Sequence, residues 1–287
     1  MKLCVSSYSL SRWRRENGKT LEDTIDVVAD IGVTAIEFSG LDNAVKPLQR
    51  AAKLRTYAER RGVTIASYST WAELLRPPAQ QATAVAALKK EVDVAAALGV
   101  DRMRHDVTWG YGQSAHGLKG PRTFAAALRV VVPAIREVAN YGAAHGVRTS
   151  LENHGFFMQA SRRVEQLIRT VNHKNFGLTM DMGNFMCVNE PPVSAVRRVA
   201  KYAQMVHTKD FHARPKKTLP LPGWFATPTP IALRGAIVGH GVIDVPKQIA
   251  ILKRAGYRGF LSLEFEGLEE PLTAVKMGVE YLRGLLK

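Results

Sequence analysis

The sequence predicts an α/β fold of one domain, a (β/α)₈ TIM barrel, and three observations support this prediction. The chain has 287 residues and 46% hydrophobic residues, which suits one barrel with one large core. Short β-branched segments alternate with longer amphipathic segments, as in repeated βα units. Glycines mark the ends of the helical segments. We therefore expect residues 1–287 to form one barrel.

The strand segments come first. Short runs rich in β-branched residues have the length of buried strands, and helical segments separate them, which favours parallel pairing. In chain order they are Leu3–Tyr8, Ala35–Phe38, Thr64–Tyr68, Arg102–His105, Arg148–Glu152, Phe176–Asp181, Ala203–His207 and Phe260–Glu264. These eight segments match the number that closes a TIM barrel.

The helical segments have apolar residues at three- and four-residue spacing. The clearest are Leu21–Ile31, Lys46–Arg61, Ala82–Leu98, Phe124–His145 and Val164–Val171. A glycine separates the end of a helical segment from the next strand five times, at Gly32, Gly62, Gly99, Gly146 and Gly256. Glycine adopts the left-handed conformation that ends a helix without a Cβ penalty, so this repeat is the main sequence support for the barrel.

One segment interrupts the alternation. Between His212 and Gly241 the chain carries five prolines and shows no clean periodicity. Because it follows the seventh strand segment, it should cross the C-terminal rim, where the active sites of barrels lie. We expect a long rim loop over residues 212–243, either as a lid over the site or as a mobile connection or oligomer contact.

The charge balance bears on which classes of partner the chain could bind. The chain has 40 Lys and Arg against 25 Asp and Glu, a net charge of +15. Such an excess can indicate an anionic partner, but the basic residues are spread in short clusters beside helices, which favours solvated faces. Nucleic acid is therefore a weakly supported partner.

Cysteine content and apolar segments bear on the compartment. Cys4 and Cys187 are too few for a disulfide framework, and we expect both to be buried thiols. No basic leader precedes an apolar region, and no segment approaches the roughly 20 apolar residues of a membrane span. We expect a cytoplasmic protein without a membrane partner.

Ionisable side chains end four of the predicted strands, and these are Glu152, Asp181, His207 and Glu264. One such carboxylate could simply cap a helix or pair with a lysine. Four at the catalytic rim of one barrel predict a shared site. Three carboxylates and one imidazole suit one divalent metal ion, with Mn²⁺ favoured and Mg²⁺, Co²⁺ or Zn²⁺ as alternatives.

Strand alternation adds candidates for substrate binding, because residues two apart face the same side. His154 follows Glu152 by two positions, Lys209 follows His207, and Glu266 follows Glu264. The alternative role for His154 and Lys209 is a structural hydrogen bond. Glu37, at the end of the second strand, is expected to bind a substrate hydroxyl. Arg104 and His105 are adjacent in a strand and face opposite sides, so at most one of them should face the pocket.

The rim segment supplies further candidates. His240 is expected to be an additional catalytic acid, and His212 could share that role or contact substrate. Arg214 and Trp224 are expected to contact the sugar. For each, the alternative is ordinary packing in a loop.

Four phrases around these residues resemble the sugar phosphate isomerase/epimerase superfamily, the xylose-isomerase-like barrels. The phrases lie at 151–155, 180–184, 206–212 and 263–267, and the resemblance covers nearly the whole chain. It implies that Glu152, Asp181, His207 and Glu264 hold the metal. It also implies that Glu152 and Glu264 exchange a proton on opposite faces of a ketose, while the metal polarises the carbonyl.

The chain departs from the 3-epimerases of that superfamily at Asn184, where they usually carry histidine, and in the long rim segment. That segment is more similar to relatives that act on 3-keto-glycosides by β-elimination or hydration. We therefore predict an isomerase or epimerase of a keto-sugar that works through an enediolate, with a 3-keto-glycoside lyase or hydratase as the alternative.

Two other classes stay open. A nucleic-acid phosphodiesterase of the endonuclease type would need more histidine and carboxylate ligands than the sequence offers. A non-catalytic sugar-binding protein would bind a sugar without abstracting a proton from it. The resemblance also implies a homodimer or homotetramer.

Overall fold

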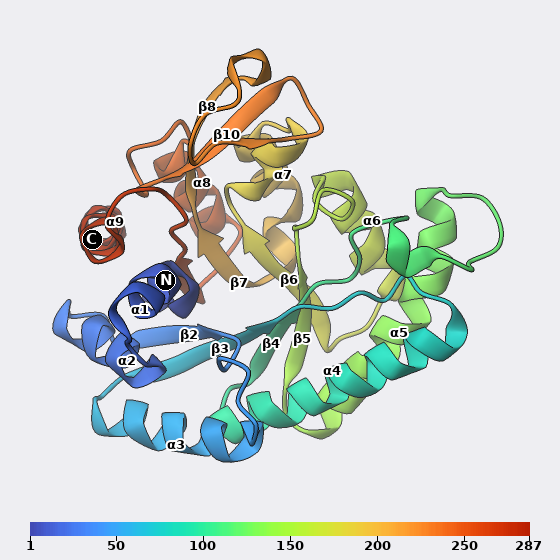
Figure 1. Ribbon diagram of the computed structural model, residues 1–287, viewed down its shortest axis with the longest axis horizontal. Coiled ribbons are helices and arrows are strands. Elements are labelled where there is room, and N and C mark those ends of the chain that lie inside the picture. Colours follow the sequence, from blue (N-terminus) through green and yellow to red (C-terminus); the bar gives the residue numbers. More distant parts are fainter.

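The computed structural model describes all 287 residues and confirms one closed barrel (Figure 1). Its parallel strands close in the order β1-β11-β7-β6-β5-β4-β3-β2. Their bounds are β1 Lys2–Ser6, β2 Ala35–Ser39, β3 Thr64–Thr70, β4 Arg102–His105, β5 Arg148–Glu152, β6 Phe176–Asp181, β7 Ala203–Thr208 and β11 Phe260–Leu263.

The predicted strands are all present, and β4, β5 and β6 have the predicted bounds. The predicted end of β1 at Tyr8 is wrong, because the chain turns at Ser6 into a 3₁₀ turn over Ser7–Leu10. Strand β11 ends at Leu263, but the amide of Glu264 still donates to the carbonyl of Thr208 in β7 at 3.0 Å. Glu264 therefore stays fixed at the rim.

Helices surround the barrel and pack in sequence order, α3 against α4 and so on to α7 against α8. Their bounds are α1 Ser11–Asn17, α2 Leu21–Asp30, α3 Pro47–Arg60, α4 Pro78–Leu98, α5 Phe124–Ala144, α6 Ser161–Val171, α7 Pro192–Val199, α8 Val245–Arg254 and α9 Pro271–Leu286. The five predicted helices are confirmed, although α4 begins four residues early at Pro78, whose fixed φ suits a first turn. The five punctuating glycines all have φ between 67° and 77°.

The core lies between the strands and this helical layer and contains 70 buried residues in one cluster. The packing is close enough to exclude side chains at some positions. Gly142 of α5 is an example, since a Cβ there would stand 2.5 Å from the carbonyl oxygen of Val147. Cys4 and Cys187 are both buried thiols, as expected.

The rim segment differs from the expected irregular loop. It forms an antiparallel sheet, called here the rim sheet, with β8 Asp210–Pro215, β9 Phe225–Ala226 and β10 Ile231–Ala236 in the order β8-β10-β9. Strand β8 follows β7 after the single residue Lys209. The sheet projects from the barrel beside α7 and α8 (Figure 1).

Asp210 fixes the base of the rim sheet. Its carboxylate accepts hydrogen bonds from the backbone amides of Gly239 at 3.0 Å, Gly241 at 2.9 Å and Ile243 at 3.1 Å. A Cβ on Gly241 would stand 2.1 Å from the Oδ1 atom of Asp210, so only glycine fits. The glycines around His240 thus bind a carboxylate of the chain itself.

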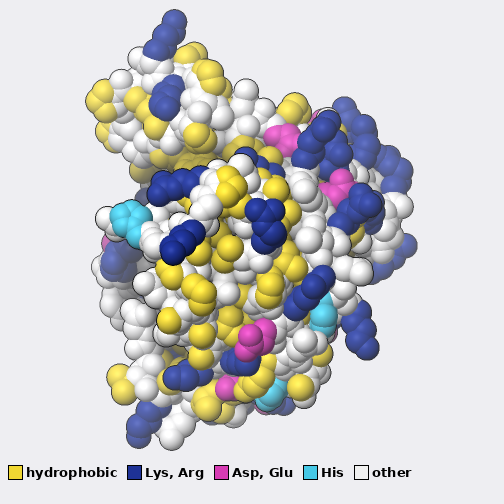
Figure 2. All heavy atoms as spheres, turned by 90° about the vertical axis from the view of Figure 1, so that its right-hand side faces the viewer, with side chains coloured by type: hydrophobic (Ala, Val, Ile, Leu, Met, Phe, Trp, Pro, Cys, Tyr) yellow, Lys and Arg dark blue, Asp and Glu magenta, His cyan; other side chains and the backbone are white.

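The outer surface carries the basic excess. Figure 2 shows Lys and Arg side chains spread over one face with few acidic side chains among them, as expected for solvated helix faces. None of the helices combines the length and apolar composition that crossing a bilayer requires.

Candidate metal centre

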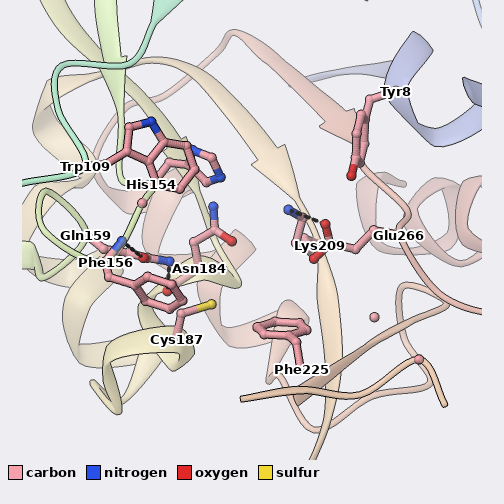
Figure 3. Close-up of a pocket in the computed structure, with 13 residues that line it drawn as sticks. Tyr8, Trp109, His154, Phe156, Gln159, Asn184, Cys187, Lys209, Phe225 and Glu266 are labelled. Carbon is pink, nitrogen blue, oxygen red and sulfur yellow. Dashed lines mark hydrogen bonds and ion pairs between the residues drawn. The ribbon is translucent and has the colours of Figure 1, made fainter. Parts of the chain in front are cut away.

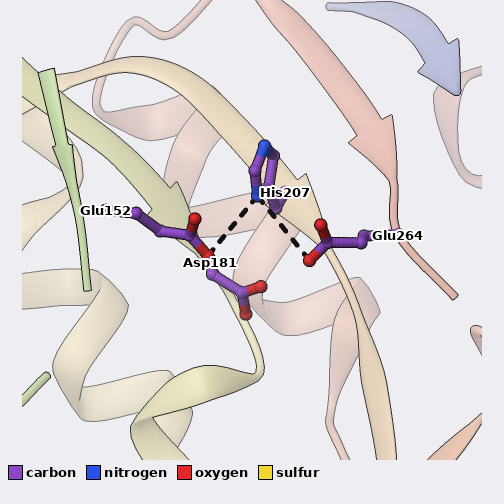
Figure 4. Close-up of side chains that lie close together, drawn as sticks. All are labelled: Glu152, Asp181, His207 and Glu264. Carbon is purple, nitrogen blue, oxygen red and sulfur yellow. Dashed lines mark ion pairs between the residues drawn. The ribbon is translucent and has the colours of Figure 1, made fainter. Parts of the chain in front are cut away.

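The four predicted metal ligands converge at the C-terminal rim (Figure 4). Each of Glu152, Asp181, His207 and Glu264 offers one donor atom, and these atoms all lie within 4.8 Å of one another. The Nδ1 atom of His207 is 3.5 Å from Oε1 of Glu152 and 3.8 Å from Oε2 of Glu264. Pairing of β7 with β6 and β11 sets this level, because His207 is the register partner of Asp181 and of Ser262.

The residues fit a divalent ion. The Nδ1 atom of His207 and the Oδ2 atom of Asp181 are buried without a hydrogen-bond partner, and both belong to the cluster. A buried polar atom without a partner costs about 1–3 kcal/mol, so a ligand at this point would relieve that cost. Ligands bound at about 2.1 Å from one ion stand at most about 4.2 Å apart, so only a small contraction is needed.

Glu37 lies behind His207 and does not face the cavity as a free group. Its carboxylate oxygens are 2.9 and 3.1 Å from Nε2 of His207 and accept hydrogen bonds from Ser69 at 2.7 Å and Ser262 at 2.8 Å. The side chain is completely buried. The structure gives no support to the prediction that Glu37 binds a substrate hydroxyl, because both its carboxylate oxygens are engaged by protein groups. Its contact with Nε2 leaves Nδ1 of His207 facing the other three residues of the cluster.

The charges of this pair support each other. Burial opposes the charge of Glu37, yet His207 and the two serines hold its pKa below the ordinary value. Burial alone would lower the pKa of His207, but the carboxylates of Glu37, Glu264 and Glu152 raise it well above the ordinary value.

Glu152 is held by Arg104 and Asn184. One nitrogen of Arg104 is 2.5 Å from Oε2, and the side-chain amide of Asn184 donates to Oε1 at 3.1 Å. Burial opposes the charge of Glu152, but Arg104 and His207 hold its pKa well below the ordinary value. Arg104 faces the site, whereas His105 is buried against Phe176, so only one of the adjacent pair reaches the pocket as predicted.

Asp181 is positioned by backbone contacts. Its Oδ1 accepts hydrogen bonds from the amides of Gly183 at 2.7 Å and Asn184 at 2.8 Å, which leaves Oδ2 toward the cluster. Asn153 bonds both the amide and the carbonyl of Asp181. Burial raises the pKa of Asp181 to about 6, although Lys209 opposes the rise.

Lys209 lies beside the ligands, as strand alternation predicts. Its buried Nζ is 2.8 Å from Glu264, 3.4 Å from Asp181 and 3.5 Å from Glu266. Burial opposes its charge, but these carboxylates raise its pKa well above the ordinary value. Lys209 is therefore a protonated lysine whose positive charge is balanced by the surrounding carboxylates.

His154 stands on the other wall. Its Nδ1 is 3.0 Å from Asp106, and its ring lies edge-on to Trp109 at 5.0 Å between centroids. Burial would lower the pKa of His154, but Asp106 and Glu152 raise it.

The cavity at this rim has two adjoining parts. The inner chamber of about 250 Å³ is bordered by Glu152, His207 and Glu264. The outer chamber of about 290 Å³ reaches the rim sheet (Figure 3). Both parts share five lining residues, which are Tyr8, Trp109, His154, Lys209 and Glu266.

The rim segment contributes differently from what the sequence predicts. His240 is exposed and lines neither chamber, so its predicted role as catalytic acid is not supported. His212 also lines neither chamber. Arg214 stacks on Trp224 at 4.8 Å, outside both chambers. The outer chamber instead meets the rim segment at Gly223, Phe225 and Gly235.

The sequence-based prediction missed the aromatic lining of the chambers, which consists of Tyr8, Trp71, Trp109, Phe156 and Phe225. Four of these residues follow a barrel strand closely, and an aromatic residue in a βα loop was the available signal. Phe225 carries no such signal, because its position depends on how β9 pairs with β10.

Comparisons with known proteins concern the fold and the family. A family model described as xylose isomerase-like TIM barrel matches residues 25–285. The rhizopine catabolism protein MocC of Rhizobium meliloti is 28% identical over 162 residues, which cover 52% of this chain and 46% of MocC. The matched part is thus about half the length of that curated relative.

Solved structures share the fold over almost the whole chain. The IolI protein with a bound zinc atom has a TM-score of 0.76 at 17% identity, covering 99% of this chain and 98% of IolI. The probable 3-DHS dehydratase AsbF of Bacillus anthracis has a TM-score of 0.75 at 16% identity, covering 99% of each chain. The D-psicose 3-epimerase of Clostridium cellulolyticum H10 has a TM-score of 0.74 at 17% identity, covering 100% of each chain.

Proposed function

The chain belongs to the xylose isomerase-like TIM barrel family, and we propose that it is a divalent-metal-dependent isomerase or epimerase of a keto-sugar or sugar derivative. The observation that carries the proposal is the convergence of Glu152, Asp181, His207 and Glu264 within 4.8 Å beside a cavity. The similarity in fold to a D-psicose 3-epimerase supports the same chemistry.

The four residues would hold the ion. When bound, a divalent ion lowers the cost of removing a proton beside a carbonyl by polarising that carbonyl. We propose Mn²⁺, with Mg²⁺, Co²⁺ or Zn²⁺ as alternatives, because the donors are three carboxylates and one imidazole. The IolI protein, which shares the fold, was solved with a bound zinc atom, and this is consistent with a metal in a barrel of this kind.

The two glutamates would carry the proton. Glu152 ends β5 and Glu264 follows β11, and both border the inner chamber from opposite sides of His207 (Figure 4). Arg104 keeps Glu152 ionised, so its carboxylate accepts the proton from the carbon beside the carbonyl. The electron pair of that C–H bond then forms an enediolate. Glu264 takes a proton from solvent and donates it to the opposite face, which gives the epimer, and Glu152 then loses its proton to solvent.

The test uses protein loaded with Mn²⁺ in D₂O. In wild-type protein we expect deuterium uptake into a ketose, followed by NMR, and we expect Glu152→Gln and Glu264→Gln each to abolish it. The matched control is Glu137→Gln, because Glu137 pairs with Lys89 on the surface at 2.7 Å. Metal analysis of each variant separates loss of the proton carrier from loss of the ion. Retained uptake in both metal-loaded variants would exclude the glutamates from the chemistry.

The outer chamber favours a second candidate, a 3-keto-glycoside lyase or hydratase. A volume of about 290 Å³ beside the inner chamber leaves room for a leaving group. The similarity in fold to a probable dehydratase is consistent with this chemistry. The first step is the same proton abstraction. With a 3-keto-glycoside in place of the ketose in the D₂O assay, release of the aglycone identifies a lyase, whereas deuterium uptake alone identifies an epimerase or isomerase.

The remaining classes lack support from the site. The chain has one group of three or more metal-ligating side chains, while an endonuclease-type phosphodiesterase would need further ones. A non-catalytic sugar-binding protein would show no deuterium uptake. A small-molecule substrate, a cytoplasmic location and a homodimer or homotetramer complete the proposal, and light scattering would test the assembly.

A further inference from the structure

The outer chamber has aromatic walls on two sides. Trp109 and Phe156 lie on one side, in the loops after β4 and β5, and Phe225 of the rim sheet lies on the other (Figure 3). Trp109 is 52% exposed and Phe156 is 40% exposed. Large aromatic side chains around a cavity are typical of ring-binding sites, since they bury much area and stack on flat groups.

The wall is built at a conformational cost. Phe156 has a φ of 59°, which is unusual for a bulky residue, and its amide donates to the side chain of Gln159 at 2.6 Å. The preceding Gly155 makes room for Trp109, because a Cβ there would stand 3.1 Å from the indole ring. Strained backbone of this kind concentrates at ligand-binding positions.

The chambers lack a free cation for a phosphate. Lys209 faces Glu264, Asp181 and Glu266, so three carboxylates already surround its ammonium group. Arg104 is engaged by Glu152 and Asp106, and His154 is engaged by the same Asp106. Phosphate recognition uses unpaired Arg or Lys donors or helix N-termini. A phosphorylated sugar would bring its charge close to Glu266 and find no such partner.

We infer that the outer chamber is a subsite for an uncharged ring, so that the substrate is a glycoside carrying a second ring and not a sugar phosphate. The inference rests on the proposed function, because it places the reacting sugar in the inner chamber. The second ring lies between Trp109 and Phe156 on one side and Phe225 on the other. The inner chamber, at about 250 Å³, takes the reacting ring.

Calorimetric titration of the Mn²⁺-loaded protein with three probes tests the subsite. The probes are phenyl β-D-glucopyranoside, methyl β-D-glucopyranoside and glucose 6-phosphate. We expect the phenyl glucoside to bind up to about tenfold more tightly than the methyl glucoside, as aromatic stacking allows. We expect glucose 6-phosphate to bind no more tightly than the methyl glucoside.

Variants locate the preference. Trp109→Leu and Phe225→Leu should bring the ratio of the two glucoside affinities close to one. The matched control is Trp224→Leu, since Trp224 neighbours Phe225 but lines neither chamber, and it should keep the ratio. Equal binding of the two glucosides, no binding of the phenyl glucoside, tightest binding of the phosphate, or an equal loss in Trp224→Leu would each overturn the inference.

The two glucosides are acetals without a free carbonyl, so the comparison between them does not depend on turnover. If no ketose takes up deuterium while the glucoside ratio holds, the proposed reaction fails and the subsite stands. If deuterium uptake is seen and the ratio is one, the reaction stands and the subsite fails.

Discussion

His207 is oriented by a side chain from the far side of the barrel. Glu37 is 170 residues away in the sequence, and it binds Nε2 so that Nδ1 is left for the metal. We expect Glu37→Gln to weaken Mn²⁺ binding by about 10- to 100-fold, the usual effect of losing such a partner. Calorimetric Mn²⁺ titration measures the change. Glu59→Gln, an exposed substitution in α3, is the control, and an equal loss there would contradict the role of Glu37.

Asp181 gives a pH dependence in the metal-free protein. Its pKa is about 6 in the folded state against an ordinary value of 3.8. Between these values the folded state binds more protons than the unfolded state, so this carboxyl lowers the free energy of unfolding as pH rises. The full effect is about 3 kcal/mol. Asn is a neutral replacement for Asp181. We therefore expect the free energy of unfolding of Asp181→Asn, relative to that of wild type, to be higher near pH 7 than near pH 4.

Urea unfolding in EDTA at both pH values measures this difference. Glu152 and Glu37, whose pKa values are lowered, contribute stability that is lost as pH falls. Comparing wild type with Asp181→Asn at each pH separates the Asp181 contribution from theirs. A difference between the two proteins that does not change with pH would exclude a raised pKa for Asp181.

At the scale of single residues, the sequence was informative about position and less so about role. A carboxylate or imidazole at a strand end must stand at the rim, so Glu152, Asp181 and His207 could be placed from the strand predictions. The direction of Glu37 depends on one ring nitrogen of His207, which is a contact across the barrel. His240 lies between two glycines, Gly239 and Gly241, whose backbone amides donate to the carboxylate of Asp210. These hydrogen bonds also join residues far apart in the sequence.

Two helical glycines should respond oppositely to the same substitution. Gly142 of α5 has no room for a Cβ, whereas nothing lies within 4 Å of a Cβ at Gly284 of α9. We expect Gly142→Ala to lower the free energy of unfolding by about 1–3 kcal/mol through overpacking. We expect Gly284→Ala to raise it by about 0.5 kcal/mol, because alanine restricts the unfolded chain. Urea unfolding of both variants measures this, and a change of the same sign would contradict the packing at Gly142.

At the scale of elements, the barrel was predictable because each βα unit carries local signals. Periodicity identified the helices, and glycine identified their ends. The rim sheet carries no such signals, because its prolines interrupt any periodicity and its pairing joins β8 to β10 across the intervening chain. An antiparallel excursion on a parallel barrel has to be seen in three dimensions.

For the whole molecule, the metal should be a stabilising ligand. An ion that binds only the folded state adds about 2.7 kcal/mol at one hundred times its Kd. For a chain of this size that corresponds to a rise in Tm of about 5 °C. We expect Mn²⁺ to raise the Tm of wild type and of Glu137→Gln, and to leave that of Glu152→Gln nearly unchanged, as measured by thermal unfolding with and without EDTA. An equal rise in Glu152→Gln would place the stabilising ion elsewhere.

The junction between β7 and β8 constrains how reactants reach the reaction centre. His207, Lys209 and Asp210 lie within four consecutive positions, and Asp210 anchors the turn at 239–243. Because β8 begins three residues after His207, an outward swing of the rim sheet that started at this junction would also move the imidazole. We therefore expect reactants to enter and leave past the loops after β4 and β5, while Asp210 holds the rim sheet in place.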